Sequence, residues 1–335
     1  MSGKAKTIAA AVLLMALYCA RGYGQLASPA ILEIDLENFV AYYGDVSDVS
    51  KLATDSNATN TVLGRNFEPS VLIADVVAVN GQPAKGTFVY HAFTLNLRVV
   101  PNPGQAIADV VRNNINETIF EILKSDGTPI GSIMANGLGV GAAPPGAPLA
   151  VTQGNSAIVG GTGAFLGARG QQGQSVQTQA VRLTSMAEDP INRRRNGGGK
   201  ARYVVHLIPM SRPEIAVTAN GPSVVHASDF TLVTAANPAS AGETLILYAT
   251  GLGPTRPGVD PGKPFTASPQ QIVNSPVEVL ANGVNGDVFY AGGFPGSVDG
   301  YHVSFRLPAG IVSGQVSLRV TAAFIPGPEV KIAVK

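Results

Sequence analysis

The sequence predicts an all-β protein with two domains, an antiparallel closed β-barrel followed by a β-sandwich. Three observations support this prediction. The 335 residues are enough for about two domains of ordinary size. They include 39 glycines and 24 prolines, which are typical of many turns and few long helices, and only 13% of them are charged. Apolar residues occur in short alternating or β-branched runs, the usual pattern of β-strands.

The N-terminus has the order of a secretory leader. Two lysines precede an apolar run over 8–17, and small residues follow up to Gly24. We therefore expect a signal peptide over 1–24 and a secreted protein, located outside the cell or at its surface. A membrane anchor is the alternative, but the apolar run is short for a span, and we expect no transmembrane segment in the mature chain. Cys19 is the only cysteine and lies within the leader, so the mature chain has no thiol nucleophile and forms no disulfide.

The first strand of the mature chain is expected from Ile31, where apolar and acidic residues alternate. Glu33, Asp35 and Glu37 share one face of this strand, and apolar residues occupy the other. Three carboxylates on one face could bind Ca²⁺ through oxygen ligands. A solvated face or a guarded strand edge is the other interpretation, and we assign no metal on this pattern alone.

Two further strands flank a hairpin turn. Residues 71–79 are almost all apolar and often β-branched, which predicts a strand covered on both faces, and Asn80-Gly81 predicts the turn that follows. Residues 87–99 alternate throughout. His91 lies on the apolar face of this strand, which could face a barrel lumen, together with Val89, Phe93, Leu95 and Leu97.

The remaining strands of the barrel are predicted from the same signals. They cover 118–123 and 130–134, joined by Asp126-Gly127, then 157–170 and 201–208. Seven or eight strands with frequent glycine suit a closed barrel, which leaves no strand edge exposed. We therefore expect a barrel domain over 30–208 and a linker over 209–216, where Pro213 ends the strand pairing.

The last part of the chain predicts a sandwich domain over 217–335. Val316, Leu318 and Val320 alternate with polar residues, as in a strand that covers a core on one face only. Loops rich in glycine and proline separate the strands, which are expected at 244–250, 276–280, 286–291, 301–307, 316–321 and 329–334.

One run in the barrel domain resembles a known signature. Residues 158–170 read IVGGTGAFLGARG, which resembles the GGTGxFxxARG signature of plant dirigent proteins, relatives of the allene oxide cyclases in their barrel fold. The resemblance implies an eight-stranded barrel that binds hydrophobic small molecules and, in the dirigent case, guides the coupling or cyclisation of a reactive intermediate. It also implies that Arg169 lines the pocket. The other motif residues have a structural interpretation, a tight hairpin with close strand approach: Gly160, Gly161, Thr162, Gly163, Phe165 and Gly170.

The second domain contains several short matches to another group of proteins. The matching residues are Asn237-Pro238-Ala239, Gly242-Glu243-Thr244-Leu245, 248–255, 291–298, Tyr301 and 307–310. They resemble the C-terminal domain that recurs on secreted proteins of Acidobacteria. This resemblance implies an immunoglobulin-like β-sandwich on a secreted bacterial protein, and it implies no particular activity.

Charge and motifs argue against several function classes. The formal net charge of +1 provides no field toward nucleic acid or an acidic membrane surface. No G-x-S-x-G motif marks a serine hydrolase, and the four histidines are scattered without metal-ligand spacing. The basic run over 193–200 predicts a flexible loop that could contact phosphate or an acidic polysaccharide. We assign no cofactor and no nucleic-acid partner.

The leading hypothesis is that His91 and Arg169 line the barrel lumen and bind a hydrophobic small molecule. The protein is then a secreted, non-catalytic binding or scaffold protein, and its sandwich contacts the cell envelope or an extracellular polymer. Two alternatives stay open: a cyclase- or dirigent-like enzyme without metal or cofactor, and a self-assembling structural protein. A lumen filled with apolar side chains favours the scaffold, whereas a cavity lined by both residues favours a ligand or a substrate. A purely structural histidine is the other interpretation of His91.

Overall fold

The computed structural model of the chain describes residues 29–43, 68–96, 112–142, 150–260 and 262–335. These residues form two compact units, Pro29–Met210 and Ser211–Lys335. The boundary between the two units, after Met210, falls inside the linker expected over 209–216. Glu214 and Ile215, within that range, already form a strand of the second unit. The signal peptide expected over 1–24 lies outside the described residues. Within the described ranges, no helix has the length and apolar character needed to cross a membrane.

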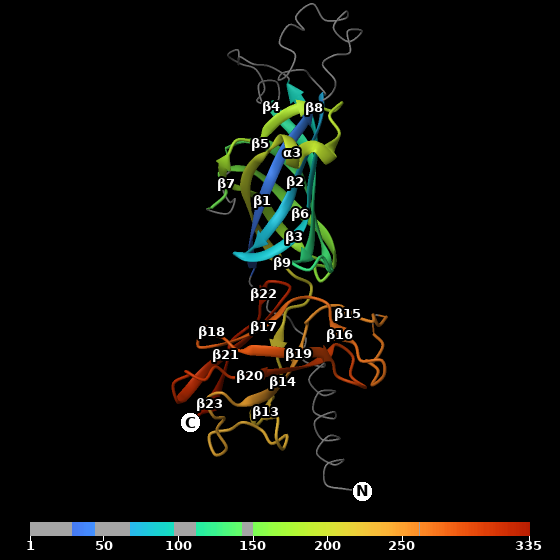
Figure 1. Ribbon diagram of the computed structural model, residues 1–335. Coiled ribbons are helices and arrows are strands. Elements are labelled where there is room, and N and C mark those ends of the chain that lie inside the picture. Colours follow the sequence, from blue (N-terminus) through green and yellow to red (C-terminus); the bar gives the residue numbers. More distant parts are fainter. Residues whose placement is uncertain (1–28, 44–67, 97–111, 143–149, 261) are drawn as a thin grey trace, which may run out of the picture. The chain divides into compact units, whose positions relative to one another are not determined.

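The first unit is a closed barrel of eight antiparallel strands, which confirms the predicted fold class (Figure 1). Consecutive strands pair from β1 to β7, β9 pairs with both β7 and β1, and β1 also pairs with β2. Each strand therefore has a neighbour on both sides. The strands are β1 (Ala30–Tyr43), β2 (Glu68–Val79), β3 (Gln82–Asn96), β4 (Arg112–Lys124), β5 (Pro129–Ala142), β6 (Gln153–Gly163), β7 (Arg169–Gln179) and β9 (Gly199–Ile208).

Turn dipeptides close two of the hairpins as predicted. Asn80 and Gly81 connect β2 to β3 with φ values of 51° and 75°, in the left-handed region that Asn and Gly adopt most easily. Gly127 has φ 91° between β4 and β5, and the Asp126 carboxylate accepts a hydrogen bond from the Thr128 amide at 2.8 Å. Local turn chemistry thus helps to set the register of both hairpins.

A short segment after β7 is fastened to the outer wall of the barrel. We call residues 182–198 the strap. It contains β8 (Arg182–Ser185), which pairs in parallel with the end of β1, and two single turns, η2 (Pro190–Asn192) and α3 (Arg193–Asn196). The expectation of a flexible loop over 193–200 is therefore wrong. The reason is a carboxylate on β2, that of Asp75, to which Arg193 and Arg194 both donate hydrogen bonds.

The second unit consists mainly of two sheets. The larger sheet contains β10 (Glu214–Ile215), β13 (Val224–His226), β14 (Thr244–Thr250), β15 (Thr255–Arg256), β16 (Ile272–Val273), β19 (Asp287–Gly293) and β20 (Gly300–Arg306). The smaller sheet contains β17 (Val277–Ala281), β18 (Val284–Asn285), β21 (Gly314–Ala322), β22 (Ile325–Pro326) and β23 (Val330–Val334). A separate two-stranded ribbon joins β11 (Val217–Thr218) to β12 (Gly221–Pro222).

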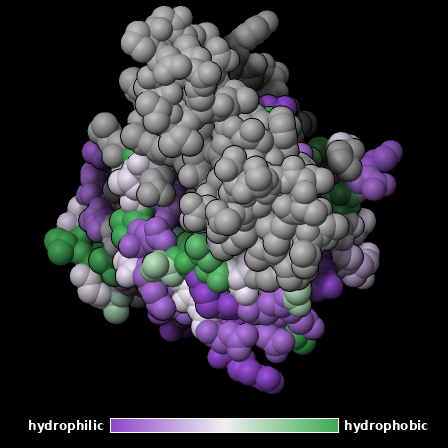
Figure 2. Space-filling model, turned by 90° about the horizontal axis from the view of Figure 1, so that it is seen from above, coloured by the Kyte–Doolittle hydropathy of each residue, from purple (hydrophilic) through white to green (hydrophobic). Residues whose placement is uncertain are grey.

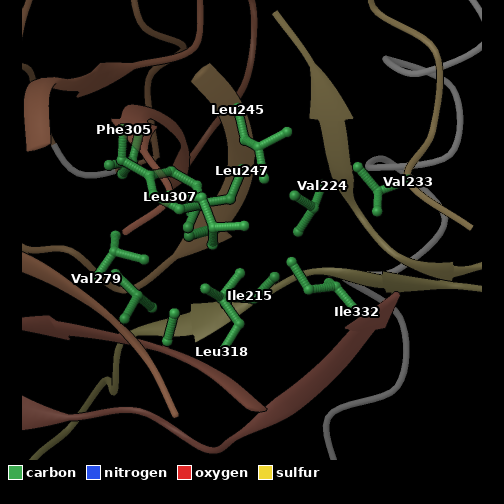
Figure 3. Close-up of a cluster of buried hydrophobic side chains, with 14 of the residues drawn as sticks. Ile215, Val224, Val233, Leu245, Leu247, Val279, Phe305, Leu307, Leu318 and Ile332 are labelled. Carbon is green, nitrogen blue, oxygen red and sulfur yellow. The ribbon is translucent and has the colours of Figure 1, made fainter. Parts of the chain in front are cut away.

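The two sheets share one hydrophobic core, as in a β-sandwich. Leu247 and Phe305 come from the larger sheet, Val279 and Leu318 come from the smaller sheet, and all four are fully buried in the cluster shown in Figure 3. Alternation along each strand directs these side chains inward. The sandwich architecture agrees with the prediction, while its immunoglobulin-like connectivity stays a prediction.

Candidate functional site

Aromatic side chains fill one part of the barrel lumen. Phe88 on β3 is fully buried, and its ring centroid lies 5.3 Å from that of Phe39, 5.1 Å from that of Phe120 and 5.0 Å from that of Tyr203. These rings come from β1, β3, β4 and β9, so they meet across the interior. Burial raises the pKa of the Tyr203 hydroxyl, which stays protonated at neutral pH. We call these four residues the aromatic floor, and this part of the lumen is a packed core.

Polar side chains face the lumen beside the aromatic floor. We name them the polar cluster: Asn116 and Thr118 on β4, Ser156 on β6 and Gln172 on β7. All four residues are at most 5% exposed. In contrast, the residues that alternate with them on β4, Ile115 and Ile119, are 50% and 41% exposed. The side chains of Asn116 and Thr118 therefore point into the barrel, whereas those of Ile115 and Ile119 point outward.

Strand register brings the members of the polar cluster together. Asn116 pairs with Gly137 on β5, and Gly137 pairs with Ser156. Because Gly137 has no side chain, the Ser156 hydroxyl donates a hydrogen bond past β5 to Asn116 Oδ1 at 3.1 Å. A Cβ at position 137 would lie only 2.7 Å from Ser156 Oγ, so even alanine would disturb this contact. Ser156 pairs in turn with Gln172, which places three cluster residues on one row of strand pairs.

Three polar atoms of this cluster are buried without a hydrogen-bond partner. They are Asn116 Nδ2, Thr118 Oγ1 and Gln172 Oε1. Burying a polar group in this way costs about 1–3 kcal/mol, and folded proteins contain few such groups. The three atoms provide a donor, a hydroxyl that can donate or accept, and an acceptor. The polar cluster therefore contains hydrogen-bonding groups that no described side chain uses.

His91 lies on the outer wall of the barrel and not in the lumen. It pairs with Val71 and Glu117, and it alternates along β3 with Phe88 and Ala92, which are fully buried. Its side chain is 42% exposed, and its Nδ1 lies 4.0 Å from the Glu117 carboxylate. The lumen position expected for His91 is therefore wrong.

The reason is that β3 has apolar residues on both faces. Val89, on the same face as His91, pairs with Ile73 on one side and Ile119 on the other, and Ile119 pairs with Met134. We call Ile73, Val89, Ile119 and Met134 the outer apolar row. Ile119 and Met134 are 41% and 38% exposed. Hydrophobic residues also reach the surface among hydrophilic ones in the part of Figure 2 that is not grey. The alternation in the sequence therefore could not show which face of β3 points into the barrel.

Arg169 also lies outside the lumen. It is the exposed first residue of β7, whereas the next residue, Gly170, pairs with the fully buried Leu207. The Arg169 guanidinium donates hydrogen bonds to the carbonyl oxygens of Val159 and Ala168, each at 2.9 Å. It therefore fastens the turn between β6 and β7. The two residues expected to line the lumen do not meet there.

The rest of the motif builds this same turn. The Thr162 hydroxyl lies 2.7 Å from that of Ser132, and Phe165 is 1% exposed within the turn. Gly170 has φ 139°, and a Cβ at this position would lie 1.9 Å from the carbonyl oxygen of His206. The other motif glycines are in the last residues of β6: Gly160, Gly161 and Gly163. These are contacts of a tight turn with close strand approach.

The three carboxylates of β1 are paired with cations of β9. Arg202 donates to Asp35 at 2.6 and 3.0 Å and to Glu33 at 3.0 Å, and Lys200 donates to Glu37 at 2.6 Å. Among the described residues, no group of three acidic, histidine or cysteine side chains could hold a metal ion. Carboxylates that already bind a guanidinium and an ammonium group do not form the Ca²⁺ site considered from the sequence.

The described residues line at least two surface clefts. One cleft of about 420 Å³ lies beside the ion pairs of Lys200 and Arg202 on the barrel wall. The other, of about 410 Å³, lies in the second unit and is lined by His226, Asp229 and Glu243 among other polar residues. The charges of the first cleft are paired with one another, and in the second cleft Glu243 and Asp229 already accept hydrogen bonds.

His226 in the second cleft uses both ring nitrogens. Nδ1 lies 2.5 Å from Glu243 Oε1, and Nε2 lies 3.2 Å from the carbonyl oxygen of Asn237. Burial disfavours the charged ring, but the bonds to Glu243 and Asn237 outweigh burial and raise the pKa of His226. An imidazolium that donates from both nitrogens has none free to act as a base. His226 therefore joins β13 to the loop before β14.

Sequence reasoning missed the polar cluster. Over 115–119, Asn116 and Thr118 share one face of the strand and Ile115, Glu117 and Ile119 share the other, and in most half-buried strands the more polar face points to water. Here that side faces the lumen. The signal that could have revealed the cluster was the placement of Thr118 and Asn116 on the same strand face as Phe120, at the start of the barrel strand expected over 118–123.

Comparison with known proteins assigns no relative to the chain. No protein-family model matches it, and no curated protein matches its sequence significantly. The resemblances to dirigent proteins and to the acidobacterial domain therefore stay predictions from the sequence. The site must be interpreted from its own geometry.

Proposed function

We propose that the protein is an exported, non-catalytic binding protein whose barrel holds a small molecule against the polar cluster. The observation that carries this proposal is the set of three buried polar atoms without partners. A barrel that served only as a filled scaffold would gain nothing from these atoms, because each one costs free energy. A ligand that bonds to them recovers this cost when it binds.

The aromatic floor changes the kind of ligand expected from the sequence. A hydrophobic molecule was expected in the lumen, but four packed rings fill part of it. The neighbouring polar cluster favours a ligand that also forms hydrogen bonds. Apolar contact with the rings and hydrogen bonding to the cluster can then act on opposite ends of one molecule.

The residue types of the polar cluster support binding over catalysis. Amides and aliphatic hydroxyls are neither acids nor bases near neutral pH, so these four residues cannot move a proton as a catalytic pair does. The cyclase- or dirigent-like enzyme is therefore the weaker alternative. In this proposal the sandwich supplies contact with the cell envelope or with an extracellular polymer.

Native mass spectrometry of the full chain, purified from cells that export it, tests the proposal. We expect an adduct of one defined mass that is released on denaturation. Gln172→Leu removes the unpartnered acceptor and should abolish the adduct, whereas Asn136→Leu removes an exposed outer-wall amide and should leave it in place. A chain without any adduct would contradict the proposal, and so would an adduct that both variants retain equally.

A second candidate function, self-assembly, is favoured by the outer apolar row. Four apolar side chains in direct register across β2 to β5, two of them well over a third exposed, are an unusual outer surface for an isolated barrel. Sedimentation velocity over a range of concentrations checks this candidate. A single monomer species at every concentration, unchanged in Ile119→Lys, would exclude assembly through this row.

A further inference from the structure

The charge of the polar cluster limits the ligand it can bind. Its four residues are all neutral, and the charged residue next to them on β4, Glu117, points to the outer wall with 69% of its side chain exposed. Moving an unpaired ion into such a site costs far more than moving a neutral polar group. The part of the ligand that enters the cluster is therefore uncharged.

Hydrogen-bonding capacity limits the ligand further. The bond from Ser156 occupies Asn116 Oδ1, which leaves the Asn116 amide nitrogen as a free donor. Gln172 Oε1 is an acceptor only, and the Thr118 hydroxyl can take either role. A ligand that satisfies all three atoms must bring both an acceptor and a donor.

The aromatic floor determines where the rest of the ligand lies. Thr118 is two residues from Phe120 on β4, so the polar cluster begins one lumen-facing position away from the packed rings. Rings of this kind favour the flat or apolar body of a ligand. The polar group of the ligand therefore faces the cluster, and its body faces the floor.

We infer that the barrel binds an uncharged molecule that carries both a carbonyl-type acceptor and an N–H or O–H donor, and a carboxamide is the simplest group of this class. This inference rests on the proposed function and adds the chemical class of the ligand to it. Asn116 donates to the carbonyl oxygen, and Gln172 accepts from the N–H group. Thr118 completes the set.

Matched probes test this class on the full chain. Benzamide is compared with benzoate and benzylamine, and acetamide with acetate and ethylamine, each at neutral pH, where only the amides are uncharged. The measurement is the shift in unfolding temperature as each probe is added. We expect at least one amide to raise the unfolding temperature with increasing concentration, and its charged counterparts to have no effect.

Variants of the polar cluster test whether the amide binds in the lumen. Asn116→Leu, Gln172→Leu and Thr118→Val each remove one hydrogen-bonding group and should weaken amide binding about tenfold. Thr118→Val changes the shape of the side chain least, so it keeps the test valid if a leucine variant does not fold. Asn136→Leu removes an exposed amide from the outer wall of β5 and should leave amide binding unchanged.

The outcomes separate this inference from the proposed function. Preferential binding of a charged probe overturns the inference and leaves the function intact. Binding of no probe also overturns the inference, and the native mass spectrum then decides independently whether the barrel holds a ligand. Amide binding that all three cluster variants retain belongs to another site and overturns the inference as well.

Discussion

Single residues of the barrel bury polar groups that the protein itself does not satisfy, and Thr118 is the simplest to test. Thr118 is 1% exposed, and its hydroxyl loses water on folding without gaining a partner. We expect Thr118→Val to raise the free energy of unfolding of the ligand-free protein by about 1 kcal/mol, measured by urea denaturation.

Thr162→Val is the matched control for this change. The Thr162 hydroxyl lies 2.7 Å from the Ser132 hydroxyl, so its removal should lower stability or leave it unchanged. If Thr118→Val is instead destabilising, the Thr118 hydroxyl has a partner in the ligand-free protein, and the argument for the polar cluster loses one of its three atoms.

His226 makes the stability of the second unit depend on pH. Its pKa in the folded chain is raised above the ordinary value of 6.5 by Glu243 and Asn237, despite the opposing effect of burial. The stability that its bonds contribute is therefore fully present below pH 6.5 and is lost as the pH rises through the raised pKa. Titration of the histidine ring protons by NMR should place the His226 midpoint above 6.5.

His302 is the control within the same unit. Burial lowers its pKa, so its ring should titrate below 6.5 under the same conditions. The reverse order of the two midpoints would contradict the account of His226, because it would mean that burial and not the two acceptors controls that ring.

The role of a charged residue cannot be predicted from its neighbours in sequence when its ion-pair partner is remote in sequence. Asp35 and Arg202 are 167 positions apart, and Asp75 and Arg193 are 118 positions apart. The acidic face of β1 suggested a metal site, and the basic run suggested a flexible loop, because neither pattern contains information about the opposite charge that pairs with it. Only closure of the barrel brings the partners together.

Individual strands and turns were predictable to the extent that their signals are local. Asn80-Gly81 and Asp126-Gly127 predicted their hairpins because Asn80, Gly81 and Gly127 are of residue types that adopt positive φ easily. The inner face of a strand is not local information. Apolar residues on both faces of β3, and the inward-facing polar residues Asn116 and Thr118 on β4, made the periodicity ambiguous where the candidate site lies.

The basic end of the strap, Arg193 and Arg194, is bound to one carboxylate of the barrel wall, that of Asp75. Arg194 and Asn38 bond it at 2.7–2.8 Å, and Arg193 bonds it as well. Burial by itself would raise the pKa of Asp75, but these bonds and charges outweigh it and lower the pKa. We expect Asp75→Ala to cost about 2–4 kcal/mol in the free energy of unfolding, because it leaves the largely buried Arg193 guanidinium without its counter-ion.

Hydrogen exchange and a surface control check the role of Asp75. Amides of the strap over 182–198 should exchange faster in Asp75→Ala, while Glu37→Ala, which removes an exposed pair with Lys200, should cost less than about 1 kcal/mol. The Asp75 contribution should also disappear as the pH falls through its lowered pKa. Equal, small losses in both variants would mean that the strap is held by other contacts.

Considered as a whole, the chain contains two separate hydrophobic cores. The aromatic floor belongs to strands before Met210, and the sandwich core belongs to residues from Ile215 onward. The composition and the spacing of turns were sufficient to predict a barrel followed by a sandwich. The closing pairs of the barrel were not, since β9 and β1 come from the two ends of the unit and no local signal joins them.

Separate expression of the two units tests this division. Each piece, 29–210 and 211–335, contains every strand of its own sheets, so each should unfold in one cooperative transition when circular dichroism is followed with temperature.

The informative control is 29–198, which lacks only the last strand of the barrel and the residues after it. Because β9 pairs with both β7 and β1, its loss opens the barrel and leaves two unpaired edges. We expect 29–198 to aggregate or to unfold without cooperativity; a transition like that of 29–210 would mean that closure does not stabilise the unit, and would remove the reason for a lumen that excludes water.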